Sequence, residues 1–559
     1  MSSKMLPVIQ PVPVPSGSAA YEAAREAILG EFAAAVPDQL HLPPSTVQKP
    51  PRNVTRIPGE CGLLSALDLE ITEKHDGYAL AKAIASGRFT AVAVATAFAK
   101  RAIIAHQLTA CLTEWFMDEA IAQAEALDAH LASTGKTVGP LHGVPVSIKA
   151  HIPIAGHWSN VGYLSTVKKD RSDCQMVAIL RKAGAVFYCK TNQPQAIMHL
   201  ESTSLYGRVL NPHNINLSAG GSSGGEAALI ALRGSVLGVG TDIGGSIRGP
   251  AAFCGIYGFK PTSYVLPMKD FLPGGAAAEL NILCSTGPMC TSLRDMDLFM
   301  SLMASAKPYL EDPRVIPLPW TGLASAPLQN SPPLKVGFMM HDGAIIPQPP
   351  VTRALEWARS RLEQTPGFQV QSFEPYQVAQ AVKNIRLAYW PDGGRDSRQR
   401  LAEAGEPVLP LTEWILADAS RGPPLDSFGV LQQRLDRDEF RCNFSQHWES
   451  QDVDLVICPS FVGPACAHET AWYWNYTAFW NYVDYPGVVV PTPVTALAKG
   501  AEDYASSDPL SEECKHVRRL WREGDFEGAP IDLQVVARRY HDSDLLGGLA
   551  ALQAALELH

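Results

Sequence analysis

Between Leu141 and Thr262 the sequence repeatedly joins short apolar runs to flexible, glycine-rich turns. From Val138 onward such runs alternate with segments of helical periodicity, whereas residues 65–135 have helical periodicity alone. Apolar runs of about four to eight residues between helices are typical of buried strands. This alternation predicts an α/β fold in which a large, mixed but mostly parallel, twisted sheet is covered by helices on both faces.

The pattern assigns most regular elements by residue range. We expect strands over 142–150, 185–191, 235–242, 335–340, 368–375, 452–459 and 529–537. We expect helices over 20–35, 78–86, 91–106, 119–132, 175–183, 226–233, 350–364 and 543–557.

The N-terminal region differs in texture from the rest of the chain. Residues 1–60 are rich in proline and are expected to form an extended arm with one helix. Residues 60–559 are expected to form a single domain. Its parts are the core motifs in 138–262, a helical N-terminal layer in 65–135, and helical, aromatic insertions in 376–485.

The overall composition narrows the function classes. A formal net charge of −10 argues against a nucleic-acid-binding surface, and without a run of about 18 apolar residues we expect no membrane span. The first residues hold only a short, proline-broken apolar stretch, which is unlike a signal peptide. The eleven cysteines lack CxxC pairs, so neither zinc nor a disulfide framework is indicated. A cytoplasmic location is therefore expected.

A glycine–serine cluster, AGGSSGGE, spans Ala219 to Glu226. Its glycines free the backbone to adopt positive φ and to approach a ligand closely. One interpretation is an entry turn to the following helix, with Ser222 or Ser223 as the N-cap. The cluster also satisfies the nucleophile-elbow pattern G-x-S-x-G, but that elbow needs a strand immediately before it, and the preceding NPHNINLSA is polar and turn-rich. By itself the cluster leaves a structural and a catalytic role open.

A second glycine–serine loop, GVGTDIGGSIRGP, spans Gly238 to Pro250 and places Ser246 behind a pair of glycines. If the glycines let the chain curl around one point, the amides from Ile243 to Ser246 would converge as an oxyanion hole. The alternative is a phosphate loop, because GVGTDIG is a near match to G-x-G-x-x-G. No acidic ribose partner is placed by pattern about twenty residues further on, which argues against that alternative.

Lys149 lies in the apolar run VPVSIK, near the end of the first expected strand. A lysine on the polar face of an alternating strand is usually only solvated. A partly buried lysine behaves differently, because desolvation disfavours the ammonium form and lowers the pKa. Since a neutral amine at pH 7 is a candidate general base, Lys149 has both interpretations.

In the order Lys149, Ser222, Ser246, these segments resemble the amidase signature family of serine hydrolases. The resemblance rests on LHGVPVSIK, NPHNINLSAGGSSGGEAALI and GVGTDIGGSIRGPAAFCGIYGFKPT. It extends more weakly over most of the chain, where FAKRAIIAHQLTACLTEWF, KAGAVFYCKTNQPQ and APIDLQVVARR look like the fungal acetamidase or general amidase branch. The resemblance implies the amidase signature fold for residues 60–559.

The resemblance also implies roles for the motif residues. Ser246 corresponds to the acyl nucleophile and Lys149 to the base. Ser222 corresponds to a bridging serine that follows a cis peptide bond. A neutral Lys149 would draw a proton through Ser222 from Ser246, because a serine hydroxyl is a poor nucleophile until a base accepts its proton. No metal or cofactor is needed. The remaining assignments are the oxyanion-hole amides of Ile243, Gly244, Gly245 and Ser246 and the supporting polar residues Ser223, Asp242 and Arg248.

One position departs from the family pattern. The residue directly after the lysine is usually acidic, and here it is Ala150, followed by His151. We expect the missing carboxylate to alter the charge balance around Lys149 or the access route, and so to affect the substrate and the rate more than the fold.

The substrate pocket is less defined by the sequence. Ile197 and Met198, with Trp480 in the aromatic run 472–485, are candidates by family position, and core packing is the alternative for each. If the aromatic run lines the pocket, it favours an apolar or aromatic acyl group.

The sequence therefore predicts an amidase that cleaves small carboxamides to a carboxylate plus ammonia or an amine. A carbamate or ester hydrolase and a biosynthetic acyl transferase are alternatives on the same site. A glutamine amidotransferase subunit and a non-catalytic nucleotide binder are further alternatives. The expected partner is a small amide. Neither nucleic acid nor a membrane span is expected, and a homodimer is left open.

Overall fold

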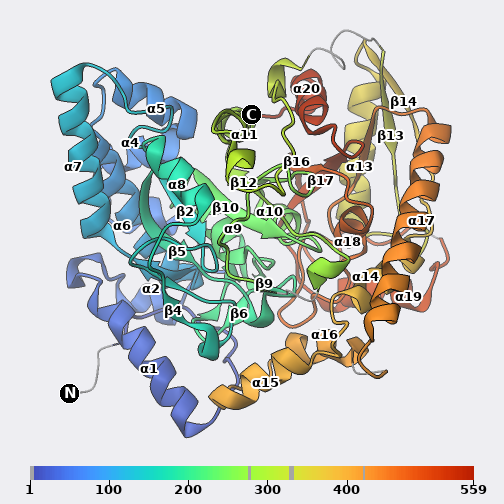
Figure 1. Cartoon of the computed structure of the whole chain (residues 1–559), viewed down its shortest axis with the longest axis horizontal. Coiled ribbons are helices and arrows are strands. Elements are labelled where there is room, and N and C mark those ends of the chain that lie inside the picture. Colours follow the sequence, from blue (N-terminus) through green and yellow to red (C-terminus); the bar gives the residue numbers. More distant parts are fainter. Residues whose placement is uncertain (1–4, 275–277, 326–332, 420–421, 506) are drawn as a thin grey trace.

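The computed structural model describes residues 5–274, 278–325, 333–419, 422–505 and 507–559. Within these residues the core is an eleven-stranded sheet of order β1-β5-β2-β10-β12-β11-β16-β17-β15-β13-β14 (Figure 1). Its strands are β1 (Leu112–Trp115), β2 (Pro145–Lys149), β5 (Val186–Thr191), β10 (Leu237–Asp242), β11 (Tyr257–Lys260), β12 (Ser285–Cys290), β13 (Leu334–Phe338), β14 (Phe368–Ser372), β15 (Leu455–Pro459), β16 (Gly487–Thr495) and β17 (Pro530–Val536).

The sheet is mixed, as expected, but its strand directions correct the expectation that most pairings are parallel. Four neighbouring pairs are parallel, namely β5 with β2, β2 with β10, β15 with β13, and β13 with β14. The other six pairs are antiparallel, including every pair from β10 through β12, β11, β16 and β17 to β15. Antiparallel neighbours need no crossover helix, so these central strands leave no strand–helix–strand signature in the sequence.

Many helices surround the sheet. They are α1 (Ala19–Ala34), α2 (Pro44–Gln48), α3 (Ile57–Glu60), α4 (Ala66–Lys74), α5 (Gly77–Ala85), α6 (Ala91–Thr109), α7 (Met117–Thr134), α8 (Gln175–Lys182), α9 (Gly224–Ala231), α10 (Arg248–Cys254), α11 (Leu293–Ser305), α13 (Pro349–Glu363), α14 (Val378–Ala388), α15 (Arg395–Ala404), α16 (Pro410–Ala419), α17 (Ser427–Gln451), α18 (Asn475–Tyr482), α19 (Glu512–Glu523) and α20 (Asp542–Leu552).

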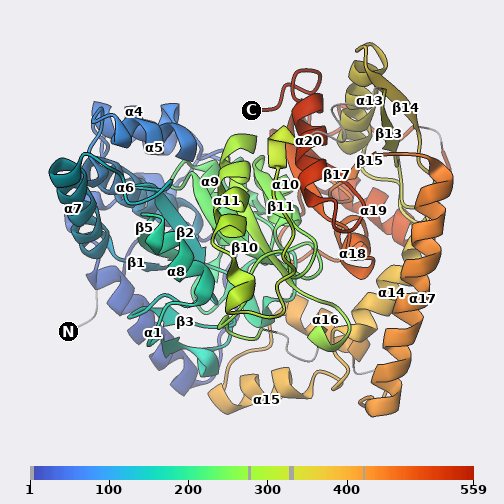
Figure 2. The same ribbon diagram turned by 45° about the horizontal axis from the view of Figure 1, so that its top comes forward.

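The central strand β12 shows that helices pack on both faces. Successive side chains of a strand point to opposite faces. Thr286 reaches the sulfur of Met176 on α8, whereas Met289 lies on the other face, beside Gly240 and the Ser223 side chain at the start of α9. Figure 2 shows α8 and α11 in front of the strands. The expected covering of both faces is confirmed at this point of the sheet.

The N-terminal arm is tied to distant parts of the chain. The amide of Ile9 donates to the carbonyl of Gln107, and that of Val54 donates to the carbonyl of Pro212. The helix expected over 20–35 is α1, and its N-cap Ser18 accepts from the amide of Tyr21. The short α2 and α3 follow, each with a proline in its first turn, where the fixed φ of proline suits helix initiation.

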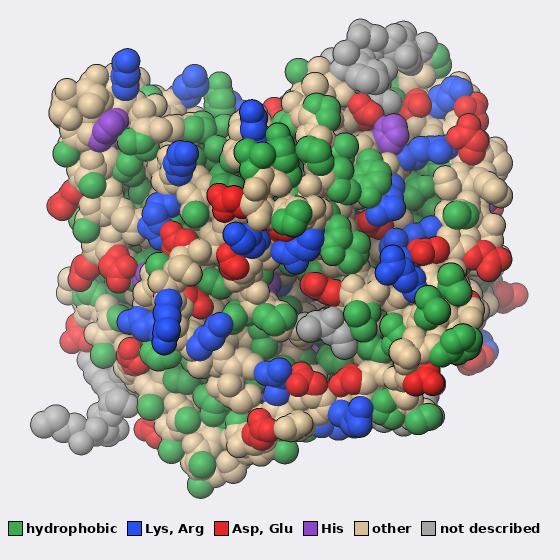
Figure 3. Space-filling model, in the orientation of Figure 1, with side chains coloured by type: hydrophobic (Ala, Val, Ile, Leu, Met, Phe, Trp, Pro, Cys, Tyr) green, Lys and Arg blue, Asp and Glu red, His purple; other side chains and the backbone are tan. Residues whose placement is uncertain are grey.

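Two surface observations bear on the expected partners. In the described part of the chain, every helix is too short or too polar to span a bilayer. On the face in Figure 3, the described basic and acidic side chains are interspersed and form no extended basic surface of the kind that nucleic acids select.

Candidate active site

The three sequence segments meet where β2 and β10 end. These strands are parallel neighbours with Val239 beside Ile148, so their carboxyl ends reach the same edge of the sheet, as is typical of ligand sites in parallel sheets. Lys149 is the last residue of β2. The turn with Ser222 leads into α9, and the loop with Ser246 connects β10 to α10.

Lys149 is fully buried and lies between two hydroxyl groups. Its Nζ is 2.7 Å from Ser222 Oγ and 3.1 Å from Thr241 Oγ1. Burial lowers the pKa of Lys149 to about 7, although Cys284, Asp242 and Glu226 act in the opposite direction. A substantial fraction of this side chain is therefore a neutral amine near neutral pH.

The turn with Ser222 is held against the loop with Ser246. The Gly221–Ser222 peptide bond is cis, as the family resemblance implied, and the amide of Ser223 donates to the carbonyl of Ser246 at 3.0 Å. Lys149 and Ser222 are 0% exposed, whereas Ser246 is 7% exposed. Of these three residues, Ser246 is the most exposed.

The loop from Ile243 to Ser246 carries amides with different partners. The amide of Gly245 donates to Asp242 Oδ1 at 2.8 Å. Among the described residues, no acceptor is found for the amides of Ile243, Gly244 and Ser246. The loop therefore offers free backbone donors beside Ser246, with Gly245 engaged in holding the loop.

Side chains from distant helices fix this loop. Tyr389 Oη donates to the carbonyl of Ile243, and Thr477 Oγ1 donates to the carbonyl of Gly244, each at 2.8 Å. Gly245 has a φ of +130°, and a Cβ there would lie 2.2 Å from Thr477 Oγ1. Only glycine fits this position.

Asp242 and Arg248 form a fully buried ion pair beneath the loop. Arg248 Nε lies 2.9 Å from Asp242 Oδ2, and Asn481 Nδ2 donates to Asp242 Oδ1 at 2.9 Å. Although burial raises the pKa of Asp242, the charge and hydrogen bonds of Arg248 keep it well below its ordinary value. Asp242 thus remains ionised and accepts from the loop amides. The supporting role expected of both residues fits these contacts.

A second buried carboxylate lies at α9. Glu226 accepts from Thr191 Oγ1 at 2.9 Å and from Ser147 Oγ at 2.5 Å. Burial raises the pKa of Glu226 to about 7, against the hydrogen bonds and Lys149, which lower it. By contrast, the Ser223 hydroxyl, expected to be supporting, is buried without a hydrogen-bond partner among the described residues.

The three candidates for the substrate pocket lie in two different surroundings. Ile197 and Met198 belong to the segment that continues through His199, whose carbonyl packs against Gly221, and they are 8% and 4% exposed. Trp480 is 0% exposed and packs among aromatic side chains; these are Phe444, Trp448, Phe479 and Tyr485. The packing of Trp480 matches the alternative of a core role.

Sequence reasoning missed Thr241, Tyr389, Thr477 and Asn481. Thr241 stands within the loop GVGTDIGGSIRGP, and its place in that motif was the one signal in the sequence that could have indicated it. Tyr389 caps the C-terminus of α14, and Thr477 and Asn481 lie in α18. Thr477 and Asn481 are polar residues in a helix that also carries four aromatic side chains. Nothing local indicates that they face a loop more than 200 positions earlier.

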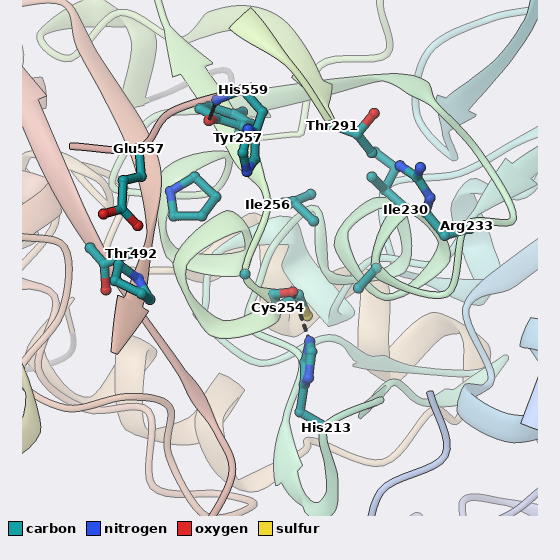
Figure 4. A pocket seen from close by; sticks show the side chains of 14 residues that line it. His213, Ile230, Arg233, Cys254, Ile256, Tyr257, Thr291, Thr492, Glu557 and His559 are labelled. Atoms are coloured by element: carbon teal, nitrogen blue, oxygen red, sulfur yellow. Dashed lines mark hydrogen bonds between the residues drawn. The ribbon is translucent and has the colours of Figure 1, made fainter. Parts of the chain in front are cut away.

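A separate cavity of about 400 Å³ lies near the end of the chain (Figure 4). His213, Arg233 and His559 help to line it, and His213 Nε2 is 3.1 Å from the carbonyl oxygen of Cys254. None of the predicted site residues lines this cavity. Within the described ranges, no group of three or more His, Cys, Asp or Glu side chains is arranged to hold a metal ion.

Comparisons with known proteins show what the whole chain is similar to. Residues 93–546 match the family model described as Amidase. An amidase-named protein of Schizosaccharomyces pombe is 42% identical over 519 residues, covering 92% of this chain and 95% of that protein. The acetamidase of Aspergillus oryzae is 36% identical over 508 residues, covering 88% and 92%. A solved structure of fatty acid amide hydrolase superposes with a TM-score of 0.89 at 31% identity, covering 96% of this chain and 95% of that one.

Proposed function

Because the chain belongs to the amidase signature family and is an enzyme that hydrolyses amides, we propose that it cleaves small carboxamides through a Ser246–Ser222–Lys149 proton relay. The observation that carries the proposal is the 2.7 Å hydrogen bond between the buried Lys149 Nζ and Ser222 Oγ.

The first step forms an acyl-enzyme. Ser246 Oγ attacks the amide carbonyl carbon, its proton passes to Ser222 Oγ, and the Ser222 proton passes to neutral Lys149, which becomes an ammonium. When the carbon–nitrogen bond breaks, the same relay returns a proton to the departing nitrogen. This return matters because an unprotonated amine anion is a very poor leaving group.

The second step releases the acid. Water attacks the Ser246 ester, gives its proton to the relay, and Ser246 Oγ leaves and is reprotonated. The overall change is amide plus water to carboxylic acid plus ammonia or an amine, and the acid then passes its proton to the amine to give carboxylate and ammonium. This chemistry is supported by the lowered pKa of Lys149, about 7, since a general base works best with a pKa near the working pH.

Charge on the carbonyl oxygen is stabilised by backbone donors of the loop. We assign this role to the amides of Ile243, Gly244 and Ser246, which have no other acceptor among the described residues. The fourth amide of the expected oxyanion hole, that of Gly245, donates to Asp242 and shapes the loop. Loss of one such donor typically raises the barrier by about 3 kcal/mol.

An apolar or aromatic acyl group suits the surroundings of the loop. A Cβ on Gly244 would lie 2.5 Å from Tyr389 Oη and 3.5 Å from a ring carbon of Trp474. Trp474 in turn packs edge-on against Trp414, with ring centroids 5.8 Å apart. Aromatic walls of this kind favour apolar groups over charged ones.

The test uses purified protein with Ser246→Ala and the matched control Ser397→Ala. Ser397 is also buried, and its hydroxyl accepts a hydrogen bond from Tyr163 Oη at 2.8 Å. We expect Ser246→Ala to lose amide turnover and fluorophosphonate labelling while Ser397→Ala keeps both. Turnover retained by Ser246→Ala would refute the relay. A panel of amides, carbamates, esters and added amines then ranks the substrate classes, and faster carbamate or ester cleavage than amide cleavage would overturn the amide preference.

A further inference from the structure

A second set of buried hydrogen bonds runs from Lys149 through Thr241 and His151 to Gln193. Thr241 Oγ1 lies 3.1 Å from Lys149 Nζ and 3.4 Å from His151 Nε2. His151 Nδ1 lies 3.0 Å from Gln193 Oε1. Thr241, His151 and Gln193 are 3%, 4% and 1% exposed, so these groups take their hydrogen bonds from one another rather than from bulk water.

Gln193 determines which group donates and which accepts in each of these hydrogen bonds. Gln193 Nε2 donates at 2.8 Å to the carbonyl of Asn160, which can only accept. The Gln193 oxygen therefore faces His151 and accepts from it, which places the imidazole proton on Nδ1. A neutral imidazole with its proton on Nδ1 has a lone pair on Nε2. That lone pair can only accept, so it receives the Thr241 hydroxyl proton.

The consequence appears at Lys149. Once the Thr241 proton is directed to His151, the Thr241 oxygen can only accept from Lys149. A neutral amine has two protons and one lone pair. With a proton given to Thr241, the lone pair is left for the Ser222 hydroxyl, as a base toward Ser222 requires. If the Thr241 hydroxyl instead donated to Lys149, it would compete with Ser222 for that lone pair.

We propose that His151 is a positioning residue that sets the direction of this hydrogen-bond chain, so that the Lys149 lone pair faces Ser222. The inference rests on the proposed relay and adds to it a residue that touches neither substrate nor Ser246. It also gives a role to His151, which lies two residues after Lys149. The residue between them, Ala150, stands where the family usually has a carboxylate.

The charged groups around the chain fit a neutral imidazole. Cys284, Asp242 and Glu226 act electrostatically on the Lys149 amine and raise its pKa. Burial, then the positive charges of Lys149 and Lys190, lower the pKa of His151 well below its ordinary value, while Gln193 opposes this. Phe271 packs edge-on against the ring at 6.0 Å. A second positive charge beside Lys149 is disfavoured, so His151 accepts rather than donates at Nε2.

The test is a double-mutant cycle with His151→Phe and Thr241→Val on kcat for an amide. Because His151 acts through Thr241, we expect each single variant to lower kcat by about tenfold with KM within about twofold, and the double variant to lose no more than either single one. Effects that multiply to about a hundredfold in the double variant would overturn the proposal.

The pH dependence of kcat/KM distinguishes a positioning role of His151 from a purely structural one, because the two roles shift the acid limb in opposite directions. In His151→Phe the Thr241 hydroxyl is free to donate to Lys149 and favours the neutral amine. The acid limb of kcat/KM should then move to lower pH by about half a unit while the plateau falls. A looser, wetter site would raise the pKa of Lys149 toward its ordinary value and move the limb to higher pH, which would overturn the proposal.

His106→Phe is the matched control. His106 is another buried imidazole whose pKa is lowered by burial, to about 3, and it accepts from the amide of Leu112. It has no contact with Lys149, so this variant should leave the acid limb in place. Failure of the proposed relay is read separately, from turnover retained by Ser246→Ala. The double-mutant cycle measures the coupling between His151 and Thr241 without assuming which residue is the nucleophile, so the two proposals can fail independently.

Discussion

The titration of Lys149 gives the sharpest prediction for this enzyme. Burial lowers the pKa of Lys149 to about 7, and the relay works only when this amine is neutral. Activity should therefore rise with pH through this pKa and then level off. If the pKa is about 7, about a tenth of the side chain is neutral at pH 6 and about nine-tenths at pH 8. Below pH 6, kcat/KM should fall by about tenfold per pH unit.

The assay is kcat/KM for one amide between pH 5 and pH 9.5, since this ratio reports ionisation in the free enzyme. Glu226 must be separated from Lys149, because burial raises its pKa to about 7 as well. Glu226→Gln provides that separation. The carboxylate raises the pKa of Lys149, so its removal should shift the acid limb to lower pH without abolishing it.

Two results would refute the reasoning. A flat profile from pH 5 to pH 9.5 would mean that no group titrating near neutrality limits the reaction. Disappearance of the acid limb in Glu226→Gln would mean that Glu226, rather than Lys149, is the group whose ionisation the wild-type profile reports.

Two further predictions concern stability. The pKa of Lys149 is lower in the folded state than its ordinary 10.5, so burying this amine destabilises the fold fully below about pH 7, less as the pH rises toward 10.5, and not at all above 10.5. Lys149→Met should therefore raise the free energy of unfolding at pH 7 by a few kcal/mol. Urea titrations measure this, and a loss of stability would contradict it. Arg248→Met leaves Asp242 buried without its cation and should lower the free energy of unfolding by about 3–5 kcal/mol. The control Arg359→Met breaks a surface ion pair with Glu363 and should change the free energy of unfolding by less than about 1 kcal/mol. Equal effects of the two variants would refute the importance of the buried pair.

The regular elements on the flanks of the sheet were predictable because they have a local period. The strand expected over 185–191 is β5, Val186–Thr191, and the helix expected over 350–364 is α13, Pro349–Glu363. The three middle strands β12, β11 and β16 were not predictable in this way. β12 reads STGPMC and β16 reads GVVVPTPVT, segments without alternation and with prolines. They are strands because their neighbours in space supply hydrogen bonds and burial.

The candidate site shows a similar division. Lys149, Ser222 and Ser246 were singled out from residue types, flanking glycines and the family resemblance. Thr477 and Asn481 were not, because they approach the Gly245 loop from α18, far away in sequence. Contacts of this range depend on how the sheet closes around the site, and no local pattern encodes them.

The sequence by itself determined which chemical groups are present, where the chain turns, and which family the chain resembles, because side-chain type, glycine flexibility and hydrophobic period are local properties. Only the tertiary structure decided that the Lys149 amine is dry and lies against Ser222 and Thr241, and that His151 and Gln193 complete the chain behind it. The pKa of an amine and the direction of a hydrogen bond depend on the groups around them, and here those groups come from separate segments that folding brings together.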